Sequence, residues 1–250
     1  MSQGFTPEAT IGPFYPGAFL SDTPQDLWTV GPLVAHRPEG QPIVFVARFI
    51  DALEQPVPSL VVEFWQANAH GRYRHPLDES DRPLDPQFDG FARLRTGDAG
   101  TLRLQTVKPG AHPVFMEREA LRLARPEPVA LRRPQGDPEL AEWVEGRARS
   151  GQALAERAVI MRAPHLRLTI FASGIDRLVT QVFFDDEPLN ATDPVLASIP
   201  DPEVRSRLIA TRRDLGAEAR VEAGERGRLE YELDIVLRGG RETPFFDDWD

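Results

Sequence analysis

The stretch Arg162-Ala-Pro-His-Leu-Arg-Leu-Thr-Ile-Phe-Ala-Ser173 decides the fold, because apolar and polar residues alternate along it from His165 onward. A period of two is typical of a half-buried strand, so the stretch predicts a strand with one face in a core. The face opposite the core carries the polar side chains of this strand: His165, Arg167 and Thr169. The core face carries the apolar ones: Leu166, Leu168 and Ile170.

The polar face of this strand also limits its chemistry. A strand with His-x-His spacing could offer two imidazoles to one metal ion. Arg167 stands where the second imidazole would be, and a guanidinium does not lose its proton, so it cannot ligate a cation. His165 is therefore the one metal ligand that this strand can supply.

The composition is that of a globular protein and excludes several classes. The 250 residues are 41% hydrophobic and 27% charged, and they include no cysteine, which excludes disulfides, thiolate metal sites and a cysteine nucleophile. The formal net charge of -10 argues against general nucleic-acid binding, which needs clustered basic residues. We see no secretory signal pattern and no apolar run long enough to cross a bilayer, so we expect a cytoplasmic protein without a membrane span.

The pattern along the chain predicts many short strands. The 24 prolines and 19 glycines indicate frequent turns. Strands are predicted at 43–50, 60–66, 91–95, 101–107, from 158 onward, at 165–172, 178–185 and 227–237, the last with its acidic residues facing outward. Residues 97–100 have the composition of a hairpin turn, and residues 75–90 read as a long irregular loop.

The remaining segments complete the predicted organisation. Residues 1–40, rich in proline, glycine and aromatic residues, read as an extended arm. Residues 115–157 read as a helical insertion with helices at 116–125 and 138–149, and a further helix is predicted at 201–213. Together these patterns predict an all-β protein, a β-sandwich in one domain spanning 1–250.

Several motifs, in this order and spacing, resemble the intradiol ring-cleavage dioxygenase family. They cover roughly 200 positions and leave out mainly the insertion. The motifs are Thr6-Pro, Thr10-x-Gly-Pro-Phe14, the strand at 60–66 followed by Asn68-x-x-Gly71-x-Tyr73, Thr106-Val-Lys-Pro-Gly110, Ala163-Pro-His165 and Phe183-Phe-Asp-Asp186. The resemblance implies a β-sandwich of the intradiol dioxygenase type.

The resemblance also implies a non-haem ferric ion held by two tyrosines and two histidines, ligands that suit this ion. The positions that match the four ligands are Ser80, His112, His165 and Arg167. Arg162 matches an arginine that steadies charge near the iron, and Tyr73 falls outside the ligand set, where we expect it to pack. One ligand is kept and His112 replaces a tyrosine, so we expect these positions to be a relic site and this chain to hold no metal.

Within the family, the arm and the segment Arg241-Glu-Thr-Pro-Phe-Phe-Asp247 look most like the alpha chains of two-chain members. This likeness implies a hetero-oligomer in which an iron-bearing beta subunit holds the Fe(III) and takes a small aromatic substrate and O2. It further implies that the arm lines the partner's substrate pocket with Thr10, Gly12, Pro13 and Phe14. An ordinary structural turn is the alternative reading of that motif.

Two other functions stay open on the sequence. One is an autonomous enzyme in which His112, His165 and a carboxylate hold a different metal. The other is a non-enzymatic sandwich that binds an aromatic ligand or a partner protein through the proline-rich arm.

Overall fold

Strands are the main regular elements of the computed structural model, which describes residues 38–78, 80–117, 157–172, 175–213 and 229–246. The strands are β1 Pro42–Ile50, β2 Val61–Trp65, β3 Phe91–Arg95, β4 Thr101–Val107, β5 His112–Glu117, β6 Arg157–Arg162, β7 His165–Ala172, β8 Ile175–Phe184, β9 Ile209–Arg213 and β10 Leu229–Val236. The helices are short: the 3-10 helix η2 Pro188–Ala191, α3 Pro194–Ser198 and α4 Pro202–Ser206.

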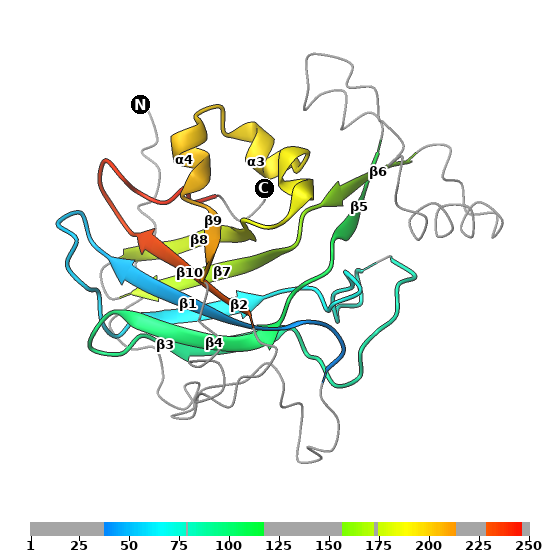
Figure 1. Cartoon of the computed structure of the whole chain (residues 1–250), viewed down its shortest axis with the longest axis horizontal. Coiled ribbons are helices and arrows are strands. Elements are labelled where there is room, and N and C mark those ends of the chain that lie inside the picture. The colour runs from blue at the N-terminus through cyan, green and yellow to red at the C-terminus, as the bar shows by residue number, and fades with distance from the viewer. Residues whose placement is uncertain (1–37, 79, 118–156, 173–174, 214–228, 247–250) are drawn as a thin grey trace, which may run out of the picture.

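Eight of these strands form two sheets that face each other (Figure 1). The β1 sheet has the order β4-β1-β10-β9, and the β7 sheet has the order β3-β2-β7-β8. Two parallel residue pairs join β8 to β9 and make the strand order continuous: Phe183 with Ile209 and Phe184 with Ala210. The remaining strands, β5 and β6, pair antiparallel with each other.

The core between the sheets follows from the alternation of apolar residues. On β7 the predicted inward side chains are all buried: Leu166, Leu168 and Ile170. They pack in one cluster with inward residues of the β1 sheet, among them Phe45, Leu104 and Tyr231. At about 25 cal/mol per Å² of apolar surface, this shared core is the main stabilising contribution to the fold. The predicted all-β sandwich is confirmed.

The hairpin predicted at 97–100 is wrong. Gly100 N donates to Gly97 O at 2.9 Å, so a turn is present, but it connects the two sheets instead of two paired strands. Among the described residues, β3 pairs with β2 and β4 pairs with β1. Both strands bury their alternate residues in the shared core, Leu94 from one side and Leu104 from the other, and this burial sets them in facing sheets.

The helix predicted at 201–213 is wrong in its second half. Asp201 caps α4, which ends at Ser206. Residues 209–213 form β9 because they find partners on both sides, through β8 and β10. Glu230 on β10 lies on the face opposite the core residue Tyr231, as predicted, but its carboxylate is buried there against Arg103, at 2.7 Å, and Arg213, at 3.3 Å.

Residues 115–117 and 157, at the two ends of the insertion predicted at 115–157, are strand. The β5–β6 pairing extends to Glu117 and Arg157, so the start of the helix predicted at 116–125 is strand, because Met116 pairs across with Ala158. The rest of that helix, the helix at 138–149, and the arm with Thr10, Gly12, Pro13 and Phe14 lie outside the described residues.

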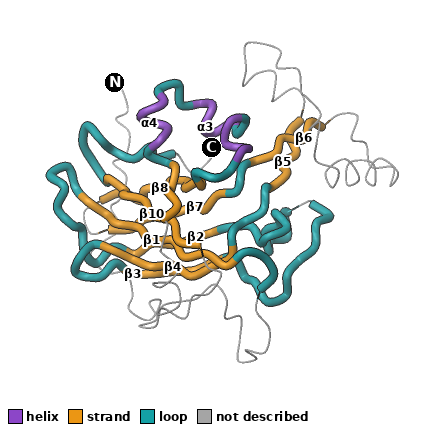
Figure 2. The backbone as a smooth tube through the Cα atoms, viewed as in Figure 1, coloured by secondary structure: helices purple, strands orange, loops and turns teal. Residues whose placement is uncertain are grey.

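The loop between β2 and β3 is irregular, as predicted for 75–90, and lies next to the start of β5 (Figure 2). Where the chain is described, no helix has the length and apolar character that a bilayer crossing requires.

Candidate functional site

Four aromatic rings meet on the outer face of the β7 sheet, where the β2–β3 loop approaches the starts of β5 and β7. Tyr73 Oη lies 3.4 Å from His165 Nε2. The Tyr73 ring meets the His112 ring edge-on, with centroids 4.8 Å apart, and stacks on Trp65 at 5.8 Å. The fold therefore brings two matched positions, His112 and His165, to the same phenol.

His165 is a buried, neutral imidazole with a fixed tautomer. Its Nδ1 lies 2.7 Å from the carbonyl oxygen of Ala163, which can only accept, so Nδ1 carries the proton. Burial, and next the charge of Arg162, lower the pKa of His165 to about 4. Its Nε2 is therefore a hydrogen-bond acceptor that faces the Tyr73 hydroxyl at neutral pH.

His112 is held in the same way from the other side. Its Nδ1 donates to the carbonyl oxygen of Gly71 at 2.9 Å, and the Asp78 carboxylate lies 3.9 Å from the same nitrogen. Burial lowers the pKa of His112. Like His165, it presents an unprotonated Nε2 at neutral pH.

Tyr73 remains a phenol rather than a phenolate. Burial raises its pKa to about 12, although the charges of Arg162 and Arg167 act in the opposite direction. The hydroxyl consequently donates toward His165. The packing role predicted for Tyr73 is supplemented by this polar contact at the centre of the site.

Arg162, at the end of β6, is fixed by two side chains that sequence reasoning missed. Its Nε donates to Asp193 Oδ2 at 2.9 Å, and its Nη2 donates to Gln181 Oε1 at 2.6 Å. Gln181 lies on β8, and Asp193 caps α3. The Asp-Pro pair at 193–194 is a helix-start signal in the sequence, but no local pattern indicates its contact with Arg162.

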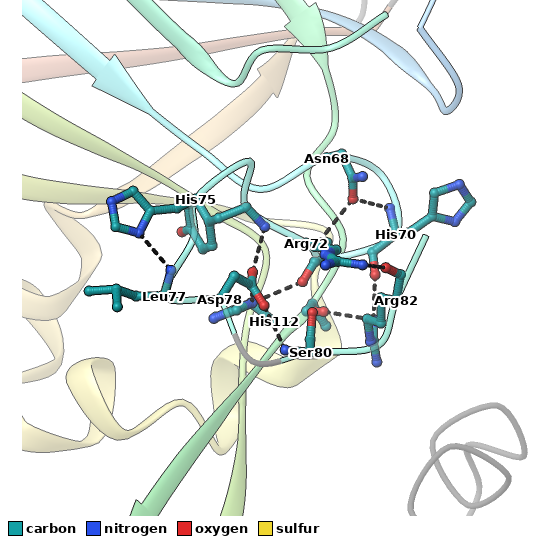
Figure 3. Close-up of polar contacts among 12 residues, drawn as sticks. Asn68, His70, Arg72, His75, Leu77, Asp78, Ser80, Arg82 and His112 are labelled. Atoms are coloured by element: carbon teal, nitrogen blue, oxygen red, sulfur yellow. Dashed lines mark hydrogen bonds and ion pairs between the residues drawn. The ribbon is translucent and has the colours of Figure 1, made fainter. Parts of the chain in front are cut away.

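Hydrogen bonds and ion pairs fix the conformation of the β2–β3 loop (Figure 3). Asp78 accepts from the backbone N–H of Tyr73 at 2.7 Å and of Ser80 at 2.8 Å. Arg82 Nη1 donates to two carbonyl oxygens, of His70 at 2.7 Å and of Ala111 at 2.9 Å. These bonds join the loop to the residue that precedes His112.

Ser80, at the position of the first tyrosine ligand, lies in this loop and is 3% exposed. Its Oγ is buried and has no hydrogen-bond partner among the residues that the structure describes. Arg167, at the position of the second histidine, pairs on β7 with Trp65 of β2 and Gln181 of β8. The structure therefore places all of the predicted relic positions at one end of the β7 sheet.

These side chains do not fit a ferric ion with two tyrosinate and two imidazole ligands. The phenol nearest the imidazoles has a raised pKa, and two guanidinium charges, Arg162 and Arg167, act on it. Ser80 is too short to replace a tyrosine, and Arg167 cannot ligate a cation. No cluster of three or more His, Cys, Asp or Glu suited to a metal occurs within the described part of the chain.

A groove of about 740 Å³ lies elsewhere, on the β1 sheet between β10 and α4. Its arginines are paired: Arg48 with Asp234, Arg207 with Glu203, and Arg241 with Glu54. The groove does not reach the aromatic and imidazole cluster.

A family model described as Dioxygenase matches residues 12–129 and 143–239. The chain belongs to the intradiol ring-cleavage dioxygenases. It is 34% identical over 209 residues to a protocatechuate 3,4-dioxygenase beta chain of Burkholderia cepacia, covering 83% of this chain and 68% of that one. It is 28% identical over 251 residues to the corresponding alpha chain of Pseudomonas putida, covering 97% and 96%.

A solved relative shows the same fold. The hydroxyquinol 1,2-dioxygenase of Pseudomonas putida superposes with a TM-score of 0.51 at 19% sequence identity. The match covers 94% of this chain and 67% of that chain. The family's sandwich is thus present here.

Proposed function

We propose that this chain is the non-metal-binding alpha subunit of protocatechuate 3,4-dioxygenase. In the complex, an iron-bearing beta subunit holds the Fe(III), and this chain completes its active site. The reaction inserts both atoms of O2 between the hydroxyl-bearing carbons of protocatechuate and gives 3-carboxy-cis,cis-muconate. The family supplies the ring-cleavage chemistry, and the assignment of the alpha role is our inference.

One observation carries this assignment: Arg167 occupies the strand position at which the second imidazole is required. Arg167 pairs in register with Trp65 of β2 and Gln181 of β8, and it lies on the same face of β7 as His165. A permanent cation at this place repels a metal ion, and the low dielectric of a buried site strengthens the repulsion. The match to an alpha chain over nearly the full length of both chains supports the same role.

Co-expression with a beta-type partner tests the proposal. We expect the two chains to purify as one complex that consumes O2 when protocatechuate is added, and we expect this chain alone to be inactive. Absence of a complex, together with no gain in activity over the partner alone, would favour the non-enzymatic sandwich instead.

The contribution of the arm can be tested within that complex. Replacing Thr10 with valine should raise the KM for protocatechuate about fivefold if its hydroxyl donates one hydrogen bond to the substrate. Thr23→Val, in the same arm, is the matched control and should leave KM unchanged. Equal effects of the two variants, or none of Thr10→Val, would show that the arm does not line the pocket.

An autonomous metal enzyme is the second candidate, because two neutral imidazoles, His112 and His165, both contact Tyr73 and each carries its proton on Nδ1. Metal analysis of the isolated chain distinguishes the two. A stoichiometric metal that is lost in a His112→Ala, His165→Ala double variant would favour this candidate.

A further inference from the structure

We propose that Asp193 is the positioning residue of the site, a single buried carboxylate that holds both Arg162 and His165 in place. The inference goes beyond the alpha-subunit assignment, because it concerns contacts within this chain and applies whichever chain holds a metal. It can therefore fail, or hold, independently of that assignment.

One carboxylate oxygen of Asp193 bonds Arg162 directly and is linked to His165 through Ala163. Oδ2 accepts from Arg162 Nε at 2.9 Å and from the backbone N–H of Ala163 at 2.8 Å. The carbonyl oxygen of Ala163 in turn accepts from His165 Nδ1 at 2.7 Å. The guanidinium is thus oriented by Oδ2 directly, whereas the imidazole is linked to Oδ2 through one residue, Ala163, whose N–H bonds Asp193 and whose carbonyl accepts from His165.

The other oxygen keeps the carboxylate itself from rotating. Oδ1 accepts from the backbone N–H groups of Val195, at 2.9 Å, and Leu196, at 3.4 Å, as the cap of α3. Asp193 is fully buried, so its four donors are all protein groups. Helix α3 therefore acts as the anchor from which the carboxylate points at the site.

Charge gives Asp193 a second task. Arg162 has 14% of its side chain exposed, and its positive charge faces two neutral imidazoles. Among the described residues, Asp193 is the carboxylate in direct contact with it, whereas Gln181 offers a neutral oxygen on the other side. A half-buried cation with its counter-ion removed is costly, so Arg162 would turn toward solvent.

The isosteric variant Asp193→Asn separates these tasks from helix capping. Asparagine is as good an N-cap as aspartate, so α3 is kept while the charge is lost. The readout is the hydrogen-exchange rate of Arg162 Nε–H in ¹⁵N NMR spectra, with the signal assigned by its disappearance in Arg162→Lys. We expect exchange to become at least about tenfold faster in Asp193→Asn, because the single amide oxygen caps α3 and the Nδ2 donor then faces Arg162 where Oδ2 accepted.

Asp201 provides a matched control, because it also caps a five-residue helix that begins with a proline. Within the described residues, its bonds are to its own helix and not to Arg162 or His165. Asp201→Asn should leave the Arg162 and His165 signals unchanged. The proposal is wrong if Asp193→Asn leaves Arg162 exchange unchanged, or if Asp201→Asn accelerates it equally.

A second variant keeps the test decisive if Asp193→Asn does not fold. The double variant Arg162→Met, Asp193→Asn removes the unpaired charge as well as its partner, and we expect it to fold and to unfold at a higher temperature than the single variant. If the double variant is no more stable than Asp193→Asn, Asp193 acts as a helix cap alone and the proposal is overturned.

Discussion

At the scale of single residues, the site is defined by which charges the fold tolerates. His165 and His112 are kept neutral by burial, Tyr73 keeps its proton, and Arg162 keeps its charge beside a buried carboxylate. The family positions of His165 and Arg167 could be predicted from the sequence. The two side chains that fix Arg162, Gln181 and Asp193, could not be predicted, because they come from distant elements.

The neutral state of His165 predicts a pH dependence of stability. Its pKa is about 4 in the folded chain and ordinarily about 6.5, so the unfolded chain binds the extra proton between these values. Above pH 6.5, His165 causes no loss of folding stability, because it is neutral in both the folded and the unfolded chain. As the pH drops toward 4, the free energy of unfolding should fall by about 1.4 kcal/mol per pH unit.

Urea unfolding at several pH values gives the unfolding free energy of the wild type and of His165→Gln, whose side chain does not titrate. The difference in unfolding free energy between wild type and variant should shrink as the pH falls from 6.5 to 4.5. A difference that stays constant over this range would contradict the buried neutral imidazole.

At the scale of elements, the β2–β3 loop and the turn before β5 touch through their backbones. Gly71 has φ +77°, and a Cβ there would lie 1.9 Å from the carbonyl oxygen of Ala111. Lys108, which starts that turn, bonds Asp186 at 2.8 Å and Glu187 at 2.6 Å, and it also lies over the ring of Tyr231. Close contact on one side and ion pairs on the other hold His112 in place.

Gly71→Ala should destabilise the chain by about 3 kcal/mol or more, because it adds both a positive-φ penalty and a backbone clash. Gly97→Ala is the control: no atom lies within 4 Å of its Cβ position, and we expect a change within about 0.5 kcal/mol. Chemical denaturation compares the two variants. Similar costs at both glycines would refute the close approach at Gly71.

Lys108→Met should cost about 2 to 3 kcal/mol of unfolding free energy, since it leaves two carboxylates without their cation. Burial lowers the pKa of Lys108, but the bonds to Asp186 and Glu187 outweigh this effect and raise it to about 12. Arg48→Met, which breaks an exposed pair with Asp234, should cost less than about 1 kcal/mol. Thermal and urea unfolding measure both variants. Equal losses of unfolding free energy in the two would show that the Lys108 ion pairs stabilise the chain no more than an exposed pair does.

At the scale of the whole molecule, the local sequence pattern predicts where strands lie but not which strands pair with each other. The bounds 91–95, 101–107 and 165–172 follow from the period-two alternation and match β3, β4 and β7. The turn at 97–100 has a hairpin composition, yet it crosses between sheets because each flanking strand finds a better partner elsewhere. Residues 209–213 likewise become β9 through pairing with β8 and β10.

The same distinction explains the site. Family motifs locate His112, His165 and Arg167, because these positions are carried by short segments with fixed spacing. The contact of Tyr73 with both imidazoles depends on how the β2–β3 loop folds back over the β7 sheet, which no local pattern encodes. A relic metal site predicted from sequence therefore becomes, in the structure, a packed and hydrogen-bonded cluster.

The most direct test of the central claim is the iron content and visible spectrum of the chain purified alone and with a beta-type partner. We predict that the isolated chain contains no stoichiometric iron and shows no tyrosinate-to-iron absorption band. In the complex, we predict one iron per pair of chains. A stoichiometric iron-tyrosinate band from the isolated chain would contradict the account.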